Sequence, residues 1–269
     1  MLIDVSSCIG CKACMTACKA NHAIPFGEHM GHEYYRIHPL EVEKGQYPYV
    51  IRNMTPILCM QCEEAPCTEV CPISGALYRR PDGVILVDGQ KCTGCKQCVA
   101  VCPYDAIYYC DDREVVDKCD FCVENIDQGS QPECVAACPC DAMVVGDVDD
   151  AESEISLLIN ELDARPLGLE TQTRLSVYYT RHAARLKGTV REKHSGIPIA
   201  GVAVRITCLG EGITETTRTD SGGVFFFWSL KADLRYVLTI EDDCCAPISM
   251  DVDLQSEYLD IGSISVMKR

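Results

Sequence analysis

Several features of membrane, nucleic acid-binding and secreted proteins are missing from this sequence. Basic residues are outnumbered, with 24 Lys and Arg against 40 Asp and Glu, and the formal net charge is −16. Nucleic acid phosphates require clustered Lys and Arg, so this balance argues against a nucleic acid partner. No run approaches the roughly 18 to 20 apolar residues that a membrane-spanning helix needs. The sequence therefore predicts a chain without a membrane span of its own.

The first residues, Met1 to Cys8, lack the basic and apolar regions of a signal peptide. Recognisable catalytic motifs are also lacking: there is no Ser–His–Asp set, no phosphate-binding loop and no GxGxxG fingerprint. We therefore expect a soluble, cytoplasmic chain that has no catalytic residue of its own.

Cysteine, in contrast, is abundant, with 21 residues in a chain of 269. So many cysteines indicate either a disulfide scaffold or metal binding. Disulfide scaffolds are typical of short secreted chains that carry a signal peptide. The length and the N-terminus of this chain therefore favour metal binding.

Sixteen of the cysteines form four groups with a repeating spacing. The first and third groups read C-x2-C-x2-C-x3-C, the second C-x2-C-x4-C-x3-C and the fourth C-x2-C-x11-C-x3-C. The groups are Cys8, Cys11, Cys14 and Cys18; Cys59, Cys62, Cys67 and Cys71; Cys92, Cys95, Cys98 and Cys102; and Cys119, Cys122, Cys134 and Cys138. In runs of this type three thiolates converge on one iron–sulfur cubane, and the fourth Cys ligates a neighbouring cluster. Structural zinc sites use paired CxxC or mixtures of Cys and His instead, so the spacing predicts four [4Fe–4S] clusters.

Other residues repeat together with the cysteines. Proline follows the second, third and fourth groups, and glycine inside the first and third loops, at Gly10 and Gly94, permits close approach of the backbone to sulfur. Short β-type stretches precede three of the groups, at 2–5, 84–87 and 115–116. The pattern predicts a ferredoxin unit of strands and helical turns, repeated along residues 1–146.

Five cysteines lie outside the groups, and four of the six histidines lie close together in one insertion. The cysteines are Cys110, Cys140, Cys208, Cys244 and Cys245. We interpret them as small buried hydrophobes, although the adjacent pair Cys244-Cys245 is open to a redox role. The histidines, in an insertion over residues 19–58, are His22, His29, His32 and His38. Their spacing matches no regular metal site, which favours packing or interface roles.

The pattern changes beyond residue 146. Residues 147–185 are expected to form a helix, with Asp149 or Asp150 as its N-cap and Gly168 near its end, and then an extended connector. Residues 186–269 alternate apolar and polar positions in about seven short strands, which predicts a small β-sandwich. This segment resembles the transthyretin-like regulatory domain of some carboxypeptidases. The expected fold class is α+β: two tandem ferredoxin modules followed by an all-β sandwich.

The four cysteine groups together resemble the electron-transfer (β) subunits of the dimethyl-sulfoxide-reductase family of molybdopterin oxidoreductases. This resemblance implies that the first group pairs with the fourth and the second with the third. The implied ligand sets are Cys8, Cys11, Cys14 and Cys138 (set one); Cys119, Cys122, Cys134 and Cys18 (set two); Cys92, Cys95, Cys98 and Cys71 (set three); and Cys59, Cys62, Cys67 and Cys102 (set four). It also implies a large catalytic partner carrying molybdenum or tungsten bis-pterin, and a separate protein that donates or accepts electrons.

A narrower resemblance is carried by residues 31–35, 45–48, 56–67 and 177–179 and by the C-terminal β-rich segment. They are similar to the small subunit of pyrogallol–phloroglucinol transhydroxylase, a branch related to catechol dehydroxylases and resorcinol hydroxylases. The resemblance implies a partner that acts on polyhydroxylated aromatics. The alternative functions are a β subunit serving a sulfur, sulfoxide or nitrogen oxyanion reductase and a free polyferredoxin. The alternative to a cytoplasmic location is export in folded form on a partner's twin-arginine signal.

Overall fold

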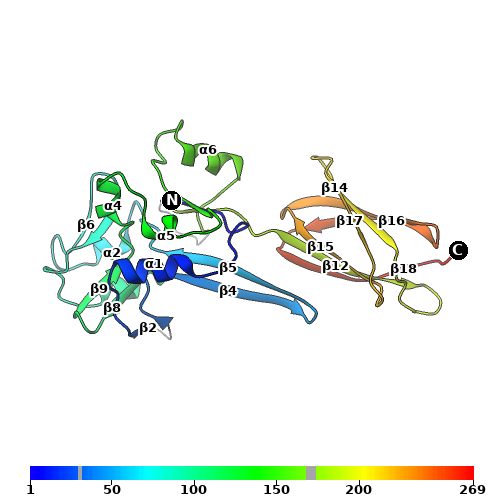
Figure 1. Cartoon of the computed structure of the whole chain (residues 1–269), viewed down its shortest axis with the longest axis horizontal. Helices are drawn as coiled ribbons and strands as arrows, with labels where there is room; N and C mark the ends of the chain where they lie inside the picture. The colour runs from blue at the N-terminus through cyan, green and yellow to red at the C-terminus, as the bar shows by residue number, and fades with distance from the viewer. Residues whose placement is uncertain (30–31, 168–173) are drawn as a thin grey trace. The chain divides into compact units, whose positions relative to one another are not determined.

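The computed structural model describes residues 1–29, 32–167 and 174–269 (Figure 1). Gly31, the first residue of the range 31–35 named above, and Gly168 lie outside the described residues. The chain divides into two compact units: unit 1 comprises Met1–Glu43 and Arg52–Arg181, and unit 2 comprises Lys44–Ile51 and His182–Arg269. Each unit has its own hydrophobic core.

Unit 1 consists of short helices and very short strands, as expected for loops that surround clusters. Its elements are β1 (Leu2–Ile3), α1 (Ala13–Asn21), β2 (Glu28–His29), β3 (His32–Glu33), α2 (Pro66–Glu69), β6 (Leu77–Arg79), β7 (Ile85–Val87), α3 (Gln97–Val101), β8 (Ile107–Cys110), β9 (Val115–Lys118), α4 (Val123–Asp127), α5 (Glu133–Ala136), β10 (Met143–Val144), α6 (Glu154–Glu161) and β11 (Tyr178–Tyr179). Antiparallel pairs β6–β7 and β8–β9 alternate with the helices. This is the ferredoxin arrangement that the repeated cysteine groups predict.

The segment expected to be a connector folds back on unit 1. Strand β11 pairs in parallel with β1, which also pairs in antiparallel fashion with β10. The helix within this segment begins later than expected, because its N-cap is Ser153, whose side chain accepts a hydrogen bond from the N–H of Ser156. The prediction of Asp149 or Asp150 as the cap is therefore wrong.

The insertion contains a hairpin that the sequence analysis does not predict. Strands β4 (Ile37–Gln46) and β5 (Tyr49–Leu58) pair with each other. The tip, residues 44–51, belongs to unit 2, where the Tyr49 ring stacks on Phe226 with 5.7 Å between the ring centroids. Most of β4 is exposed on both faces, so it has no apolar alternation to mark it as a strand.

Unit 2 is the predicted sandwich. Its strands are β12 (Ala184–Glu192), β13 (Ala203–Cys208), β14 (Thr214–Arg218), β15 (Val224–Leu230), β16 (Leu234–Asp242), β17 (Cys245–Leu254) and β18 (Tyr258–Val266). They form two sheets, in the orders β15–β12–β18 and β14–β13–β16–β17. The alternating apolar residues of β13 and β16 are buried in the core: Val204, Ile206, Tyr236, Leu238 and Ile240. Phe225 and Phe227 of β15 are buried with them.

Leu238 offers a test of this core, because its side chain is fully buried, with 0 % exposure. We expect Leu238→Ala to lower the free energy of unfolding of unit 2 by about 2 to 5 kcal/mol, through lost burial and a cavity. Leu209→Ala is the matched control, since Leu209 is 51 % exposed. Denaturant unfolding of the full chain, followed by fluorescence of Trp228 in β15, measures both, and equal effects would contradict this packing.

Candidate iron–sulfur cluster sites

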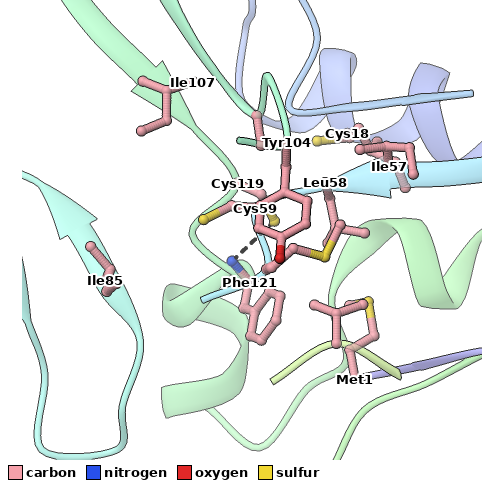
Figure 2. Packing of buried hydrophobic residues seen from close by; sticks show 14 of the residues in the cluster. Met1, Cys18, Ile57, Leu58, Cys59, Ile85, Tyr104, Ile107, Cys119 and Phe121 are labelled. Atoms are coloured by element: carbon pink, nitrogen blue, oxygen red, sulfur yellow. Dashed lines mark hydrogen bonds between the residues drawn. The ribbon is translucent and has the colours of Figure 1, made fainter. Parts of the chain in front are cut away.

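The grouped cysteines are part of the hydrophobic core of unit 1. Cys18, Cys59 and Cys119 are buried in the same apolar cluster as Tyr104 and Phe121. Figure 2 shows this packing, with a dashed line from the backbone N–H of Phe121 to Cys119 Sγ, 3.5 Å away. A core that contains so many thiols needs a role for them beyond packing, because sulfur offers no advantage there over a methyl group.

Set one surrounds a small cavity. Its lining includes the side chains of Cys8, Cys11, Cys14 and Cys138 and an apolar wall that contains Ile3, Pro56 and Met143. The N–H of Ala142 donates to Cys138 Sγ over 3.3 Å. Four sulfur donors that converge from two distant stretches of chain, with amide N–H groups aimed at sulfur, fit a cubane cluster.

Set three surrounds a second small cavity. The four thiols are those of Cys71, Cys92, Cys95 and Cys98, and the apolar wall includes Leu77. One of the four thiols, that of Cys71, again comes from a different cysteine group than the other three. Cys11 of set one and Cys95 of set three are exposed, so each of these cavities reaches the surface of unit 1.

Sets two and four lie deeper. In set two, Cys18, Cys119, Cys122 and Cys134 are all buried. Burial, reinforced by the neighbouring thiols, raises the pKa of Cys134 to about 12 and that of Cys119 well above its ordinary value. Burial, followed by the neighbouring Cys134 thiol, also raises the pKa of Cys18.

In set four, Cys59, Cys62 and Cys67 are buried and Cys102 is partly buried. Burial raises the pKa of Cys67 to about 12 and that of Cys62 to about 11, and Cys59 and Cys102 add to both shifts. Without a metal the thiols of Cys67 and Cys62 are protonated at neutral pH. Because thiolates are the metal-binding form, loading of such a site releases protons.

The loops of the first and third groups share a backbone conformation. Gly10 and Gly94 have φ of +68° and +66°, and Lys12 and Lys96, two residues on, both have φ of +63°. The two lysines occupy the N-cap positions of α1 and α3. The predicted close approach to sulfur at these glycines stays a prediction. The structure shows a different constraint at Gly94, because a Cβ atom there would lie 2.5 Å from the carbonyl oxygen of Glu114.

Two buried polar side chains join set four to set two. Gln61, between Cys59 and Cys62 in sequence, donates from Nε2 to the carbonyl of Cys119 over 2.9 Å. Lys118, 2 % exposed, donates from Nζ to the carbonyl oxygens of Ile85 and Cys119, the latter over 3.0 Å. A buried ammonium is costly without nearby negative charge. The buried ammonium of Lys118 therefore suits a site between two anionic clusters.

A polar network that the sequence analysis missed lies beside set two. His22, Asp120 and Cys122 bring one imidazole nitrogen, one carboxylate oxygen and one sulfur within 4.8 Å of one another. The Nε2 atom of His22 is 3.3 Å from Cys122 Sγ, and its Nδ1 atom is 2.9 Å from Nη1 of Arg36. Burial, followed by the nearby Arg36 guanidinium, holds the pKa of His22 below its ordinary value. The sequence predicts packing or interface roles for the histidines. At His22 the structure adds a polar contact with the sulfur of Cys122.

The five remaining cysteines behave differently from one another. Cys110, Cys208 and Cys245 are buried, and Cys208 and Cys245 belong to the core of unit 2. Cys140 is partly buried and lines the cavity of set one beside Cys138. None of the cysteines in the described ranges forms a disulfide.

Among the helices described in those ranges, none has the length and apolar character needed to cross a membrane.

The crowding at Gly94 leads to a test. We expect Gly94→Ala to lower the free energy of unfolding by more than Gly129→Ala. Both positions have left-handed φ, which costs an alanine roughly 1 to 2 kcal/mol, but a Cβ at Gly129 meets nothing within 4 Å. Anaerobic denaturant titration of the iron-loaded chain, followed by its visible absorbance, measures the difference. Equal losses would show that φ alone decides the effect.

Three family models match the chain. A 4Fe–4S dicluster domain matches residues 50–148, a 4Fe–4S binding domain matches residues 6–21, and a carboxypeptidase regulatory-like domain matches residues 185–258. The first two cover all four cysteine groups, and the third covers most of unit 2.

Curated relatives match about two thirds of the chain. It is 38% identical to a subunit of the sulfite dehydrogenase of Allochromatium vinosum, over 66% of this chain and 81% of the relative. It is 31% identical to the arsenate respiratory reductase iron–sulfur subunit of a Shewanella species, over 67% of this chain and 95% of the relative. It is 35% identical to a subunit of the tetrathionate reductase of Salmonella typhimurium, over 60% of this chain and 62% of the relative.

Among solved structures, the chain is similar to the major pilin subunit of Bacillus cereus. The two are 12% identical over 34% of this chain and 32% of the pilin, with a TM-score of 0.28, so this likeness carries no argument. The relatives and the 4Fe–4S domains decide the family instead. The chain belongs to the iron–sulfur electron-transfer subunits of molybdopterin oxidoreductases.

Proposed function

We propose that this chain holds four [4Fe–4S] clusters and relays electrons between a large molybdopterin catalytic subunit and a second redox protein. The observation that carries the proposal is the convergence of cysteines from different groups. Cys138 joins the first group around one cavity, and Cys71 joins the third group around another. Bound [4Fe–4S] clusters supply reversible one-electron transfer.

The four ligand sets are proposed as the pairing of groups implies. The ligands of set one are Cys8, Cys11, Cys14 and Cys138, and those of set two are Cys18, Cys119, Cys122 and Cys134. The ligands of set three are Cys71, Cys92, Cys95 and Cys98, and those of set four are Cys59, Cys62, Cys67 and Cys102. The mutual effects of these thiols on each other's pKa values support the buried sets two and four.

The sets follow one another in a defined order. Set one neighbours set two, because α1, which contains Cys14, packs against α5, which contains Cys134. Set two neighbours set four across Gln61 and Lys118. Sets four and three share the helices α2 and α3, which lie against each other. The exposed members, Cys11 and Cys95, belong to the two ends of this order. A row of buried sites with both ends accessible suits a relay between two partners.

The substrate of the catalytic partner is a finer proposal. We infer a partner that acts on polyhydroxylated aromatics, of the catechol dehydroxylase or transhydroxylase type, on the resemblance of residues 56–67 and 177–179 and of the appended β-domain. The names of the relatives favour the alternative, a partner that acts on a sulfur, sulfoxide or nitrogen oxyanion substrate. The complex is proposed to be cytoplasmic, with export in folded form on a partner's signal as the alternative.

Iron content tests the number of clusters and the assignment of ligands. The anaerobically loaded chain is expected to hold about sixteen iron atoms, four for each cubane. Cys98→Ala is expected to lose up to four of them. Cys110→Ala, the matched control at an equally buried cysteine, is expected to keep the full content. Zinc in place of iron, or equal losses in the two variants, would contradict the proposal.

Co-expression with the neighbouring large-subunit gene tests the partner. We expect a stable complex that contains molybdenum or tungsten and oxidises a reduced viologen when a catechol is supplied. Turnover with tetrathionate or arsenate instead would select the alternative substrate class. A redox-competent monomer that forms no such complex would reject the relay and favour a free polyferredoxin.

A further inference from the structure

We propose that His22 donates a hydrogen bond from its Nε2–H group to the sulfur of Cys122 and thereby raises the reduction potential of one cluster, that of set two. This inference rests on the proposed function, because Cys122 must be a cluster ligand for it to hold. It assigns a role to a residue outside the sixteen cysteines.

His22 is the C-cap residue of α1. His22 follows Cys18 by four residues, and its N–H donates to the carbonyl of Cys18 over 3.1 Å, which closes the helix. Residues four apart lie on the same face of a helix. One helix end therefore directs both a proposed ligand and the imidazole toward set two, and the His22 side chain is only 15 % exposed there.

The contact with Arg36 fixes the position of the imidazole proton of His22. Nη1 of Arg36 lies 2.9 Å from Nδ1 of His22. A guanidinium has donors and no acceptor, so Nδ1 must be the acceptor of this bond. In a neutral imidazole the proton is then on Nε2, the nitrogen that faces sulfur.

A sulfur and a carboxylate oxygen lie near the Nε2–H group of His22. Nε2 lies 3.3 Å from Cys122 Sγ and 3.8 Å from Oδ1 of Asp120. The carboxylate is already engaged, since Oδ1 accepts from the N–H of Cys122 over 2.9 Å and Oδ2 accepts from Arg36 over 2.7 Å. The sulfur is therefore the acceptor within hydrogen-bonding range.

Arg36 is itself held in place by two carboxylates. Its guanidinium also bonds Asp117, with 2.9 Å between Nη2 and Oδ1, and the Tyr108 hydroxyl donates to the other oxygen of Asp117 over 2.8 Å. The Tyr108 ring in turn stacks on Tyr34, with 5.1 Å between the centroids. Outer partners of this kind fix the tautomer and orientation of a histidine beside a metal centre.

A separate metal ion at His22, Asp120 and Cys122 is the competing interpretation. Arg36 occupies the second imidazole nitrogen and places a positive charge beside the site. A divalent cation would be repelled by this charge, and it would compete with the cluster for Cys122. The geometry therefore favours a hydrogen bond over coordination.

The expected effect follows from charge. Reduction adds one electron to the cluster, so a hydrogen bond donated to a ligand sulfur stabilises the reduced state more than the oxidised state. We expect loss of this bond to lower the equilibrium constant for reduction of this cluster roughly tenfold. That factor corresponds to a fall of about 59 mV in the potential of a one-electron couple.

Redox titration of the iron-loaded complex, monitored by electron paramagnetic resonance, tests the proposal. In His22→Leu one midpoint potential is expected to fall by about this amount, while the other three stay unchanged. His22→Gln retains an N–H donor and is expected to recover most of the shift. His194→Leu, at an exposed histidine of unit 2, is the control and should leave all four potentials unchanged.

The outcomes separate the two proposals. Four unchanged potentials in His22→Leu, or an equal fall in His22→Gln, would overturn the role of His22 while the relay stands. A wild-type chain without about sixteen iron atoms would instead overturn the relay.

A measurement on the unmutated histidine covers the case in which His22→Leu does not load. With 15N-histidine, the reduced wild-type complex is expected to show a histidine nitrogen coupled to one cluster, and His22→Gln is expected to lack it. Absence of that coupling from the wild type would also overturn the role of His22.

Discussion

Gathering sixteen cysteine thiols into four small groups is the constraint on which unit 1 depends. Burial raises the pKa of thiols such as Cys67 and Cys134 to about 12, so the sites stay protonated until a metal displaces the protons. Short helices, left-handed residues at loop corners and very short strands follow from the need to aim sulfur from two directions at one point. Unit 1 accordingly has little regular structure per residue, and its apolar core is built around the thiols.

The second consequence concerns charge. A chain with a net charge of −16 has few basic residues to spare, yet two of them are placed inside unit 1. Lys118 is 2 % exposed and bonds carbonyls between sets two and four. Arg36 has a side chain 12 % exposed and is held by Asp117 and Asp120 beside set two. Buried cations are costly unless negative charge is close, and anionic clusters at the two inner sets would provide it.

The sequence predicts the parts of this structure that repeat. The cysteine spacing identifies the four groups, and the alternation of β13 and β16 identifies the core of the sandwich, because both patterns are local. The β4–β5 hairpin escapes prediction, since β4 is exposed on both faces and has no apolar period. The N-cap of α6 is predicted at the wrong residue, because Asp149 and Asp150, which are also suitable N-cap residues, lie just before Ser153. His22 carries a weak signal, its spacing of four from Cys18, but Arg36 and Asp117 join it through contacts that no spacing reveals.

The arrangement also bears on how a relay through a buried core is possible. A low-dielectric interior disfavours the extra negative charge that reduction brings, so sets two and four, left to burial alone, would hold clusters of lower potential than sets one and three at the surface. The polar groups described above are concentrated at the inner sets: Lys118 between sets two and four, and His22 with Arg36 beside set two. With clusters in the proposed sets, these N–H and cationic groups would raise the inner potentials toward the outer ones and so favour electron transfer in either direction along the row.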